Sequence, residues 1–449
     1  MLATEGLREC LEGIIPGVVS TCDAEGTPNV AYMSQGLYLD AQHLALSYQF
    51  FNKTRKNILE NPRVTLGLIH PQTAQQYRVH LTYLRTETAG PVFEAMKAKL
   101  AGIASHTGMT GIFILQGSDI YRVEEVEVLP GAVLPAQPRS HRSLTALRAC
   151  AERLAACADP DALLDALLEG LASQFGVTHT LLMMLDPCRG RLYTLASRGY
   201  AASGVGSEIA VGDGVVGVAA QEGVPIRIGL MTTEYAYGRA IRDAAVKGGF
   251  AEAPETTIPF PGLADPGSQL AVPIPAPGHP MGVLLVESPE EMRFSFEDED
   301  ALVALAAQFG ALFRLLQAED EAAEAVASPL EPAAPSAAEP VRVRHFAEND
   351  SVFLDEDYLI KGVAGNILWT LLRSYVAEGR TAFSNRELRL DPSVKLPDVS
   401  DNLEARLVLL HRRLQERRAC VQIEKTGRGR FRLRVDRRLV LEESAAGLR

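Results

Sequence analysis

The sequence has few of the features that mark secreted, membrane or zinc-binding proteins. Its six cysteines among 449 residues form no CxxC pair and have no zinc-like spacing, which excludes a disulfide scaffold or a zinc module. No uninterrupted apolar run reaches the roughly 18–20 residues of a membrane helix. The N-terminal stretch MLATEGLRECLEG carries acids where a secretory signal has basic and apolar regions. We therefore expect a cytoplasmic protein with reduced thiols and no membrane partner.

Negative charge dominates the chain, but one region near its end is strongly basic. The formal net charge is −12. The window 405–438 nevertheless holds twelve Lys or Arg against three acids, so it carries +9 while the remainder carries −21. Such asymmetry predicts a basic module whose partner is a polyanion, joined to an acidic part with a different task.

Two stretches of low hydrophobic content divide the chain, which is too long for a single core. Residues 318–340 are mostly Ala, Glu and Pro and are typical of a solvated linker. Residues 129–141 contain three prolines. The expected units are 1–130, 142–317 and 341–449, and the predicted fold class is multidomain α+β.

The first unit reads as short runs rich in Val, Leu, Thr and Tyr, separated by turn residues. This pattern predicts a small antiparallel barrel with one helix over PVFEAMKAKLAGIA. In LSYQFFNKTRKNILENPRV, a strand gives way to a helix near Lys53 and Thr54. Basic and hydroxyl groups at a helix start can hold a phosphate. The alternative is a solvated helix cap with basic side chains.

Residues 15–125 resemble the FMN-binding split-barrel family that includes pyridoxamine 5′-phosphate oxidase. The resemblance rests on GTPNVAYMSQ followed by HLALSYQFFNKTRKNILENPRVTLGL. It implies an antiparallel split β-barrel in which Lys53 contacts the FMN phosphate, beside Thr54, Arg55 and Asn57. It also suggests Ser47 and Gln49 for the flavin ring edge.

Two features limit how far this resemblance extends. The oxidase's C-terminal Arg-x-His pattern is not evident, which argues against a metabolic oxidase. Some members of the superfamily bind haem or no cofactor. The candidate iron ligands in this chain would be histidines, but nothing in their spacing favours haem; they are His43, His70, His80 and His106.

Residues 142–317 resemble a GAF domain, an α/β sandwich. The matching pieces are THTLLMMLDPCRGRLYTLASRGY, GSEIAVGDGVVGVAAQEGVPIRI, SQLAVPIPAPGHPMGVLLVES and FSFEDEDALVALAAQFGALF. The resemblance implies an unknown small-molecule ligand and dimerisation, and a purely structural GAF domain is the alternative. The last helix carries an apolar strip that pairs either with its copy in a homodimer or with its own sheet; the strip consists of Leu302, Leu305, Phe309, Leu312 and Leu316.

The basic region combines a helix with a hairpin. In DNLEARLVLLHRRLQER, four leucines share one face and the arginines occupy other faces, free to meet phosphates. The segment VQIEKTGRGRFRLRV reads as a hairpin that turns at glycine. Together they resemble the winged helix–turn–helix effector domain of OmpR-type response regulators. That resemblance implies contacts with double-stranded DNA from Arg406, His411, Arg412, Arg413, Arg428 and Arg430. The alternative is a winged helix that binds protein or RNA.

Taken together, the sequence predicts a cytoplasmic homodimeric sensor and transcription regulator that couples flavin or small-ligand sensing to DNA binding. A flavin-dependent oxidoreductase regulated by its GAF and winged-helix domains is the rival. A third interpretation makes the first two units scaffolding. No residue is assigned a catalytic or metal-binding role, so the question of enzyme or regulator stays open at this point.

Overall fold

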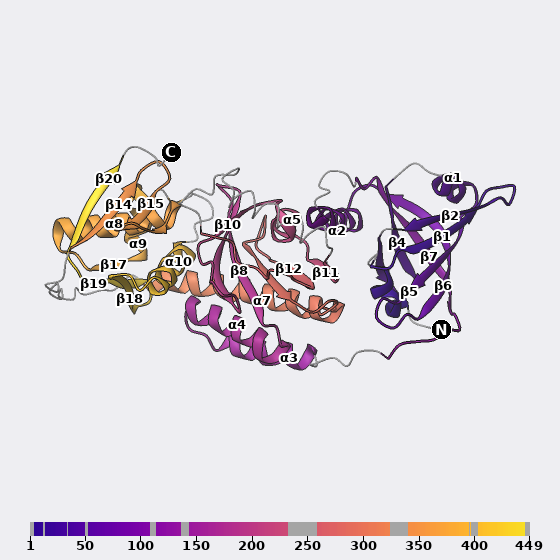
Figure 1. The fold of residues 1–449 in the computed structure, drawn as a ribbon, viewed down its shortest axis with the longest axis horizontal. Helices are drawn as coiled ribbons and strands as arrows, with labels where there is room; N and C mark the ends of the chain where they lie inside the picture. The colour runs from indigo at the N-terminus through magenta and orange to yellow at the C-terminus, as the bar shows by residue number, and fades with distance from the viewer. Residues whose placement is uncertain are drawn as a thin grey trace.

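Three units follow one another along the long axis of the computed structural model (Figure 1). The unit nearest the N-terminus lies at one end, the middle unit in the centre, and the C-terminal unit at the other end. The structure describes residues 4–11, 14–33, 35–49, 53–107, 114–135, 143–231, 258–323, 340–394, 396 and 403–444.

The first unit is built on a seven-stranded antiparallel sheet with the order β2-β1-β5-β6-β7-β4-β3. Burial alternates along β1, as expected for strands with one face on a core. The prediction of many antiparallel strands with few helices is confirmed. The elements are η1 (Thr4–Leu11), β1 (Gly17–Cys22), β2 (Pro28–Met33), β3 (Gly36–Asp40), β4 (His43–Tyr48), α1 (Lys53–Glu60), β5 (Arg63–Ile69), β6 (Gln76–Glu87), α2 (Pro91–Thr107) and β7 (Gly117–Val128).

The middle unit is a six-stranded antiparallel sheet with the order β10-β9-β8-β13-β12-β11, covered on both faces. Helices α3, α4 and α7 share a core with one face, and α5 packs on the other. Every residue of β12 and β13 is therefore buried. The elements are α3 (Ser143–Ala155), α4 (Pro160–Phe175), β8 (His179–Asp186), β9 (Arg191–Arg198), β10 (Glu208–Ala210), α5 (Gly214–Glu222), β11 (Ile226–Ile228), β12 (Ser268–Ile274), β13 (Gly282–Ser288) and α7 (Phe296–Ala323).

The apolar strip of α7 packs on the sheet of its own unit. Leu302, Leu305 and Phe309 are fully buried in the core formed with α3, α4 and the strands. This outcome selects the intramolecular alternative, so the strip no longer supports a homodimer. The segment Phe296–Ala318 is also long and apolar enough to cross a membrane, contrary to our reading of the sequence. Its buried strip marks it as a core helix of the middle unit.

The C-terminal unit combines two small sheets with three helices. One sheet has the order β16-β15-β14-β20 and the other β17-β19-β18. Helix α9 begins after Ser384, because Ser384 and Glu387 form a capping box at its start. The elements are β14 (Val341–Phe346), β15 (Ser351–Leu354), β16 (Asp357–Ile360), α8 (Gly362–Glu378), β17 (Ala382–Ser384), α9 (Asn385–Leu390), η2 (Pro392–Val394), α10 (Leu403–Glu416), β18 (Val421–Gly427), β19 (Arg430–Val435) and β20 (Leu439–Ser444).

The position of α7 in the core makes a direct prediction about stability. Phe309→Ala should lower the free energy of unfolding of the middle unit by about 3–5 kcal/mol, because it leaves a cavity where a fully buried ring stood. Leu315→Ala on the same helix is the matched control, since Leu315 is 53% exposed. Urea unfolding followed by circular dichroism measures both. Equal losses would mean that α7 does not pack as described.

Candidate functional site

A hollow of about 200 Å³ lies in the first unit between strand β4 and the start of α1. Four of the residues predicted to bind flavin line it, namely Ser47, Gln49, Thr54 and Arg55. Their convergence follows from the topology, because β4 and α1 are consecutive and β4 pairs with β7. The remaining lining residues are Val19, Ala31, Tyr32, Met33, Leu46, Tyr48, Ile58, Asp119 and Tyr121.

Arg55 is the cation of this hollow, and a carboxylate holds it in place. Its Nη1 lies 2.6 Å from Oδ1 of Asp119 on β7. The guanidinium also stands over the rings of Tyr48 and Tyr83, at 4.9 and 5.5 Å from their centroids. Burial raises the pKa of Asp119, and hydrogen bonds from the Thr86 hydroxyl and Arg55 oppose that shift. The pair is therefore an oriented unit in which Asp119 is buried and Arg55 is partly buried.

Lys53, predicted to contact the flavin phosphate, and Asn57, predicted to lie beside it, are not in the hollow. Lys53 pairs with Asp23 at 3.7 Å, beyond the end of β1, and does not line the hollow. Asn57 is fully buried and donates to the Thr21 hydroxyl at 3.1 Å, so it braces α1 against β1. The cation that lines the hollow is Arg55, two residues after Lys53 on the same helix.

The polar groups around the hollow suit the phosphate of a flavin in kind. Thr54 and Ser47 supply hydroxyls, Gln49 an amide and Arg55 a guanidinium, all of which can hydrogen-bond phosphate oxygens. Asp119 balances the charge of Arg55, so the hollow is less positive than the sequence suggested. Sequence reasoning missed Asp119, which lies 64 positions from its partner and has no local motif around it.

A second candidate site lies where the C-terminal unit meets the middle unit. Helix α10 lies beside α4 (Figure 1) and also packs on β9. Its side chains Arg406 and Arg412 contact acids of the middle unit. Arg406 Nη2 is 2.5 Å from Oδ2 of Asp186, and its guanidinium lies 3.9 Å from the centroid of the Tyr193 ring. The two charged side chains are only 11% and 5% exposed.

The other predicted DNA contacts of α10 are also engaged within the chain. Arg412 reaches Asp161 at 3.3 Å and Asp165 at 2.8 Å, both on α4. Arg413 is buried and donates from Nε to the carbonyl of Leu359 on β16 at 2.9 Å. The expectation that Arg413 faces outward is therefore wrong, since its side of α10 packs against that strand. The burial lowers the pKa of the Arg413 guanidinium.

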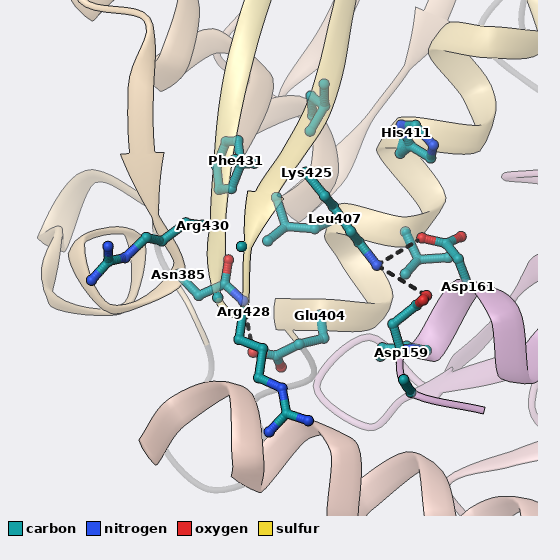
Figure 2. A pocket seen from close by; sticks show the side chains of 16 residues that line it. Asp159, Asp161, Asn385, Glu404, Leu407, His411, Lys425, Arg428, Arg430 and Phe431 are labelled. Carbon is teal, nitrogen blue, oxygen red and sulfur yellow. Dashed lines mark hydrogen bonds and ion pairs between the residues drawn. The ribbon is translucent and has the colours of Figure 1, made fainter. Parts of the chain in front are cut away.

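A hollow of about 250 Å³ opens beside this contact, between the start of α4 and the β18–β19 hairpin (Figure 2). Its wall includes Leu407, Val408, Ile423 and Phe431, together with His411, whose Nε2 lies 3.0 Å from the Gln415 amide. Lys425 Nζ bridges across it to Asp159 at 3.4 Å and Asp161 at 3.2 Å. The side chains of Arg428 and Arg430 extend in different directions from the tip of the hairpin.

Among the described side chains, one group has the atoms for a metal site. His80 of β6 and Glu125 and Glu127 of β7 bring their ligand atoms within 4.8 Å of one another. Arg78 already holds Glu127 at 2.9 Å, and the group sits on an open face of the sheet. His43 and His70 lie instead beside Asp40 and Glu9. We assign none of these residues a metal.

Comparisons with known proteins agree with the two N-terminal units. Residues 3–117 match the pyridoxamine 5′-phosphate oxidase family model, and residues 159–313 match the GAF domain model. An uncharacterized protein of Methanocaldococcus jannaschii is 43% identical over 65 residues, which are 14% of this chain and 43% of that relative. The chain thus spans less than half of that relative.

Solved structures of both types are similar to parts of the chain. The GAF domain from an Acinetobacter phosphoenolpyruvate-protein phosphotransferase is 23% identical, with a TM-score of 0.31, over 39% of this chain and 94% of that one. An FMN-binding protein from Syntrophomonas wolfei is 15% identical, with a TM-score of 0.24, over 28% and 88%. The family matches confirm a pyridoxamine 5′-phosphate oxidase-like domain and a GAF domain, types that suggest a sensory or flavin-associated protein.

The Arg55–Asp119 pair predicts a large and asymmetric effect of mutation. Arg55→Ala should destabilise the first unit by about 3–5 kcal/mol, because it leaves a carboxylate buried without its cation. The double variant Arg55→Met with Asp119→Asn should be clearly more stable than Arg55→Ala. Lys56→Ala, at an exposed neighbouring position, is the control and should change little. Urea unfolding measures all three, and a cost below 1 kcal/mol for Arg55→Ala would contradict a buried pair.

Proposed function

We propose that the chain is a sensor and transcription regulator whose C-terminal unit is a winged helix that binds double-stranded DNA. The observation that carries the proposal is the concentration of positive charge: +9 within 405–438 against −21 in the rest of the chain. Neutralising the phosphate backbone supplies much of the affinity of proteins for DNA. A local excess of positive charge of this size therefore fits DNA as the partner. The rest of the chain repels nucleic acid.

The arrangement of elements supports this reading of the C-terminal unit. Helices α8, α9 and α10 precede the β18–β19 hairpin, and α10 buries its leucine face, including Leu403, Leu410 and Leu414, in the core of the unit. In a winged helix the last helix enters the major groove and the hairpin tip reaches the neighbouring minor groove. Arg428 and Arg430 at the tip would contact the minor groove and its phosphates. Arg406, His411 and Arg412 would face the major groove.

The first two units supply the signal in this proposal. FMN would sit in the hollow beside β4, its phosphate held by Thr54 and Arg55 and its ring edge near Ser47 and Gln49. Bound there, the flavin would supply a group whose oxidation state can change. The GAF domain would take a small molecule, and a homodimer would present two winged helices to paired half-sites.

The rival function is a flavin-dependent oxidoreductase, and the hollow in the first unit favours it. The two functions differ in what the flavin does after it is reduced. Steady turnover of a reductant in the presence of FMN would favour the enzyme. Binding of FMN without turnover, together with DNA binding that depends on salt, would favour the regulator.

The hairpin tip gives a test of DNA binding. Arg428→Ala and Arg430→Ala in the full chain should each weaken binding to a duplex of arbitrary sequence. Each should also lower the slope of log K against log salt by about one unit, since one phosphate contact is lost. Fluorescence anisotropy at several salt concentrations measures this. Arg122→Ala, an exposed arginine of the first unit, is the charge-matched control and should leave the slope unchanged.

The flavin site has its own test. Thr54→Val removes a hydroxyl at the hollow while keeping the shape of the side chain, and should weaken FMN binding by roughly fivefold to tenfold, the effect of one hydrogen bond. Titration of FMN fluorescence measures the dissociation constant. Lys56→Ala serves as the control, because Lys56 lies outside the hollow. A chain that does not change FMN fluorescence at any concentration would remove flavin from the proposal.

A further inference from the structure

The surface of α10 that the proposed function assigns to DNA is covered by the middle unit. We propose that an acidic face of the GAF domain occupies the DNA-binding surface of the C-terminal unit, so that docking and DNA binding exclude each other. We call this set the acidic face and define it as Asp159, Asp161, Asp165 and Asp186. The inference rests on the proposed function and adds its regulation.

The strongest contact is the ion pair between Arg406 and Asp186. Both side chains are almost completely buried, and the guanidinium is stacked on Tyr193 of β9. Asp186 also accepts a hydrogen bond from the backbone N–H of Arg189, so its carboxylate is held in place at the end of β8. Arg406 cannot reach a phosphate or a base edge while this pair is intact.

The start of α4 holds two further basic side chains of the C-terminal unit, Arg412 and Lys425. Asp161 and Asp165 bind Arg412, while Asp159 and Asp161 bind Lys425 of the hairpin (Figure 2). Carboxylates here take the places that phosphates would take along α10 and the hairpin. A double-stranded DNA approaching from this side would meet four negative charges before it met the basic unit.

Apolar packing shows that the contact is more than a few surface charges. Leu409 lies on a different side of α10 from Leu403, Leu410 and Leu414, yet it is only 3% exposed. Its side chain comes close to Gly206 of the middle unit. The buried residues of the two units accordingly form one continuous cluster. A helix of an isolated DNA-binding domain leaves its groove-facing side open, whereas the side of α10 that carries Arg406 and Leu409 is covered by the middle unit.

Geometry makes the two states exclusive. The major groove is about 12 Å wide and an α-helix with its side chains is about 10–12 Å across, so a recognition helix fills the groove. A GAF domain packed along the same helix leaves no path for the duplex. The C-terminal unit must leave the acidic face before α10 can enter DNA, so the apparent affinity falls with the fraction of undocked chains.

The test removes charge from the acidic face and leaves the basic unit intact. The full chain carrying Asp161→Asn, Asp165→Asn and Asp186→Asn should bind an arbitrary duplex about tenfold or more tighter than the natural chain. Because any loss of negative charge favours DNA, the control carries the same number of changes elsewhere. Glu60→Gln, Glu94→Gln and Glu152→Gln lie on exposed positions away from α10 and should have a much smaller effect.

A second measurement reports the contact without DNA. Hydrogen exchange of the amides of α10 and of the first turns of α4 should speed up in the acidic-face variant and stay unchanged in the control. Faster exchange with tighter DNA binding supports the inference. Faster exchange with unchanged DNA affinity, or no change in either, overturns it while the proposed function stands. If no form of the chain binds duplex DNA even in dilute salt, the proposed function itself fails and the inference fails with it.

Discussion

The ion pair between Arg406 and Asp186 joins α10 to the middle unit, and both of its side chains are almost completely buried. Taking two opposite charges out of water costs several kcal/mol each, and their attraction offsets this only when the geometry is good. The geometry is good here. The two charged groups are in short contact, an aromatic ring lies under the guanidinium, and a backbone N–H donates to the carboxylate. Loss of one partner would leave a charge buried. The pair is therefore a constraint on where α10 can lie against the middle unit, and only weak evidence of added stability.

The distribution of charge along the chain has a structural counterpart. An acidic remainder and a basic module in one molecule attract each other whatever the module's external partner is. The acids that contact α10 lie near the ends of helices and strands. Asp161 and Asp165 are in the first turns of α4, and Asp186 is the last residue of β8. Those positions bring carboxylates to the edge of the GAF fold without disturbing its core. The acids of the middle unit therefore attract the face of α10 that carries Arg406 and Arg412.

What the sequence predicted well was encoded over short distances. The leucine face of α10 and the hairpin around Gly429 each depend on residues within a turn or two. The strand-rich first unit follows from the same kind of local pattern. For α7, the periodicity of apolar residues identified the buried strip but not its partner. A helix that packs on a sheet and a helix that packs on a second subunit have the same spacing of apolar residues.

Contacts between distant segments could not be predicted in this way. Asp119 meets Arg55 because β7 pairs with β4, and no motif surrounds it. Arg413 is on a polar side of its helix by sequence, but β16 passes beside it and supplies a carbonyl. The engagement of Arg406 and Arg412 by the middle unit required knowledge of how two units dock. The charge pattern of a sequence identifies which side chains can form ion pairs, but the fold determines which oppositely charged groups lie within reach.

The docked arrangement is one that a modest signal can shift. A buried ion pair lies close to balance between the cost of desolvation and the gain of attraction, and the surrounding pairs of Arg412 and Lys425 are partly exposed and individually weak. The hollow beside them leaves the interface incompletely packed. A ligand that shifted the docking equilibrium by about 1–3 kcal/mol, the usual range of allosteric coupling, would change the ratio of docked to undocked chains by about 5- to 150-fold. An interface of well-packed leucines alone would be harder to release.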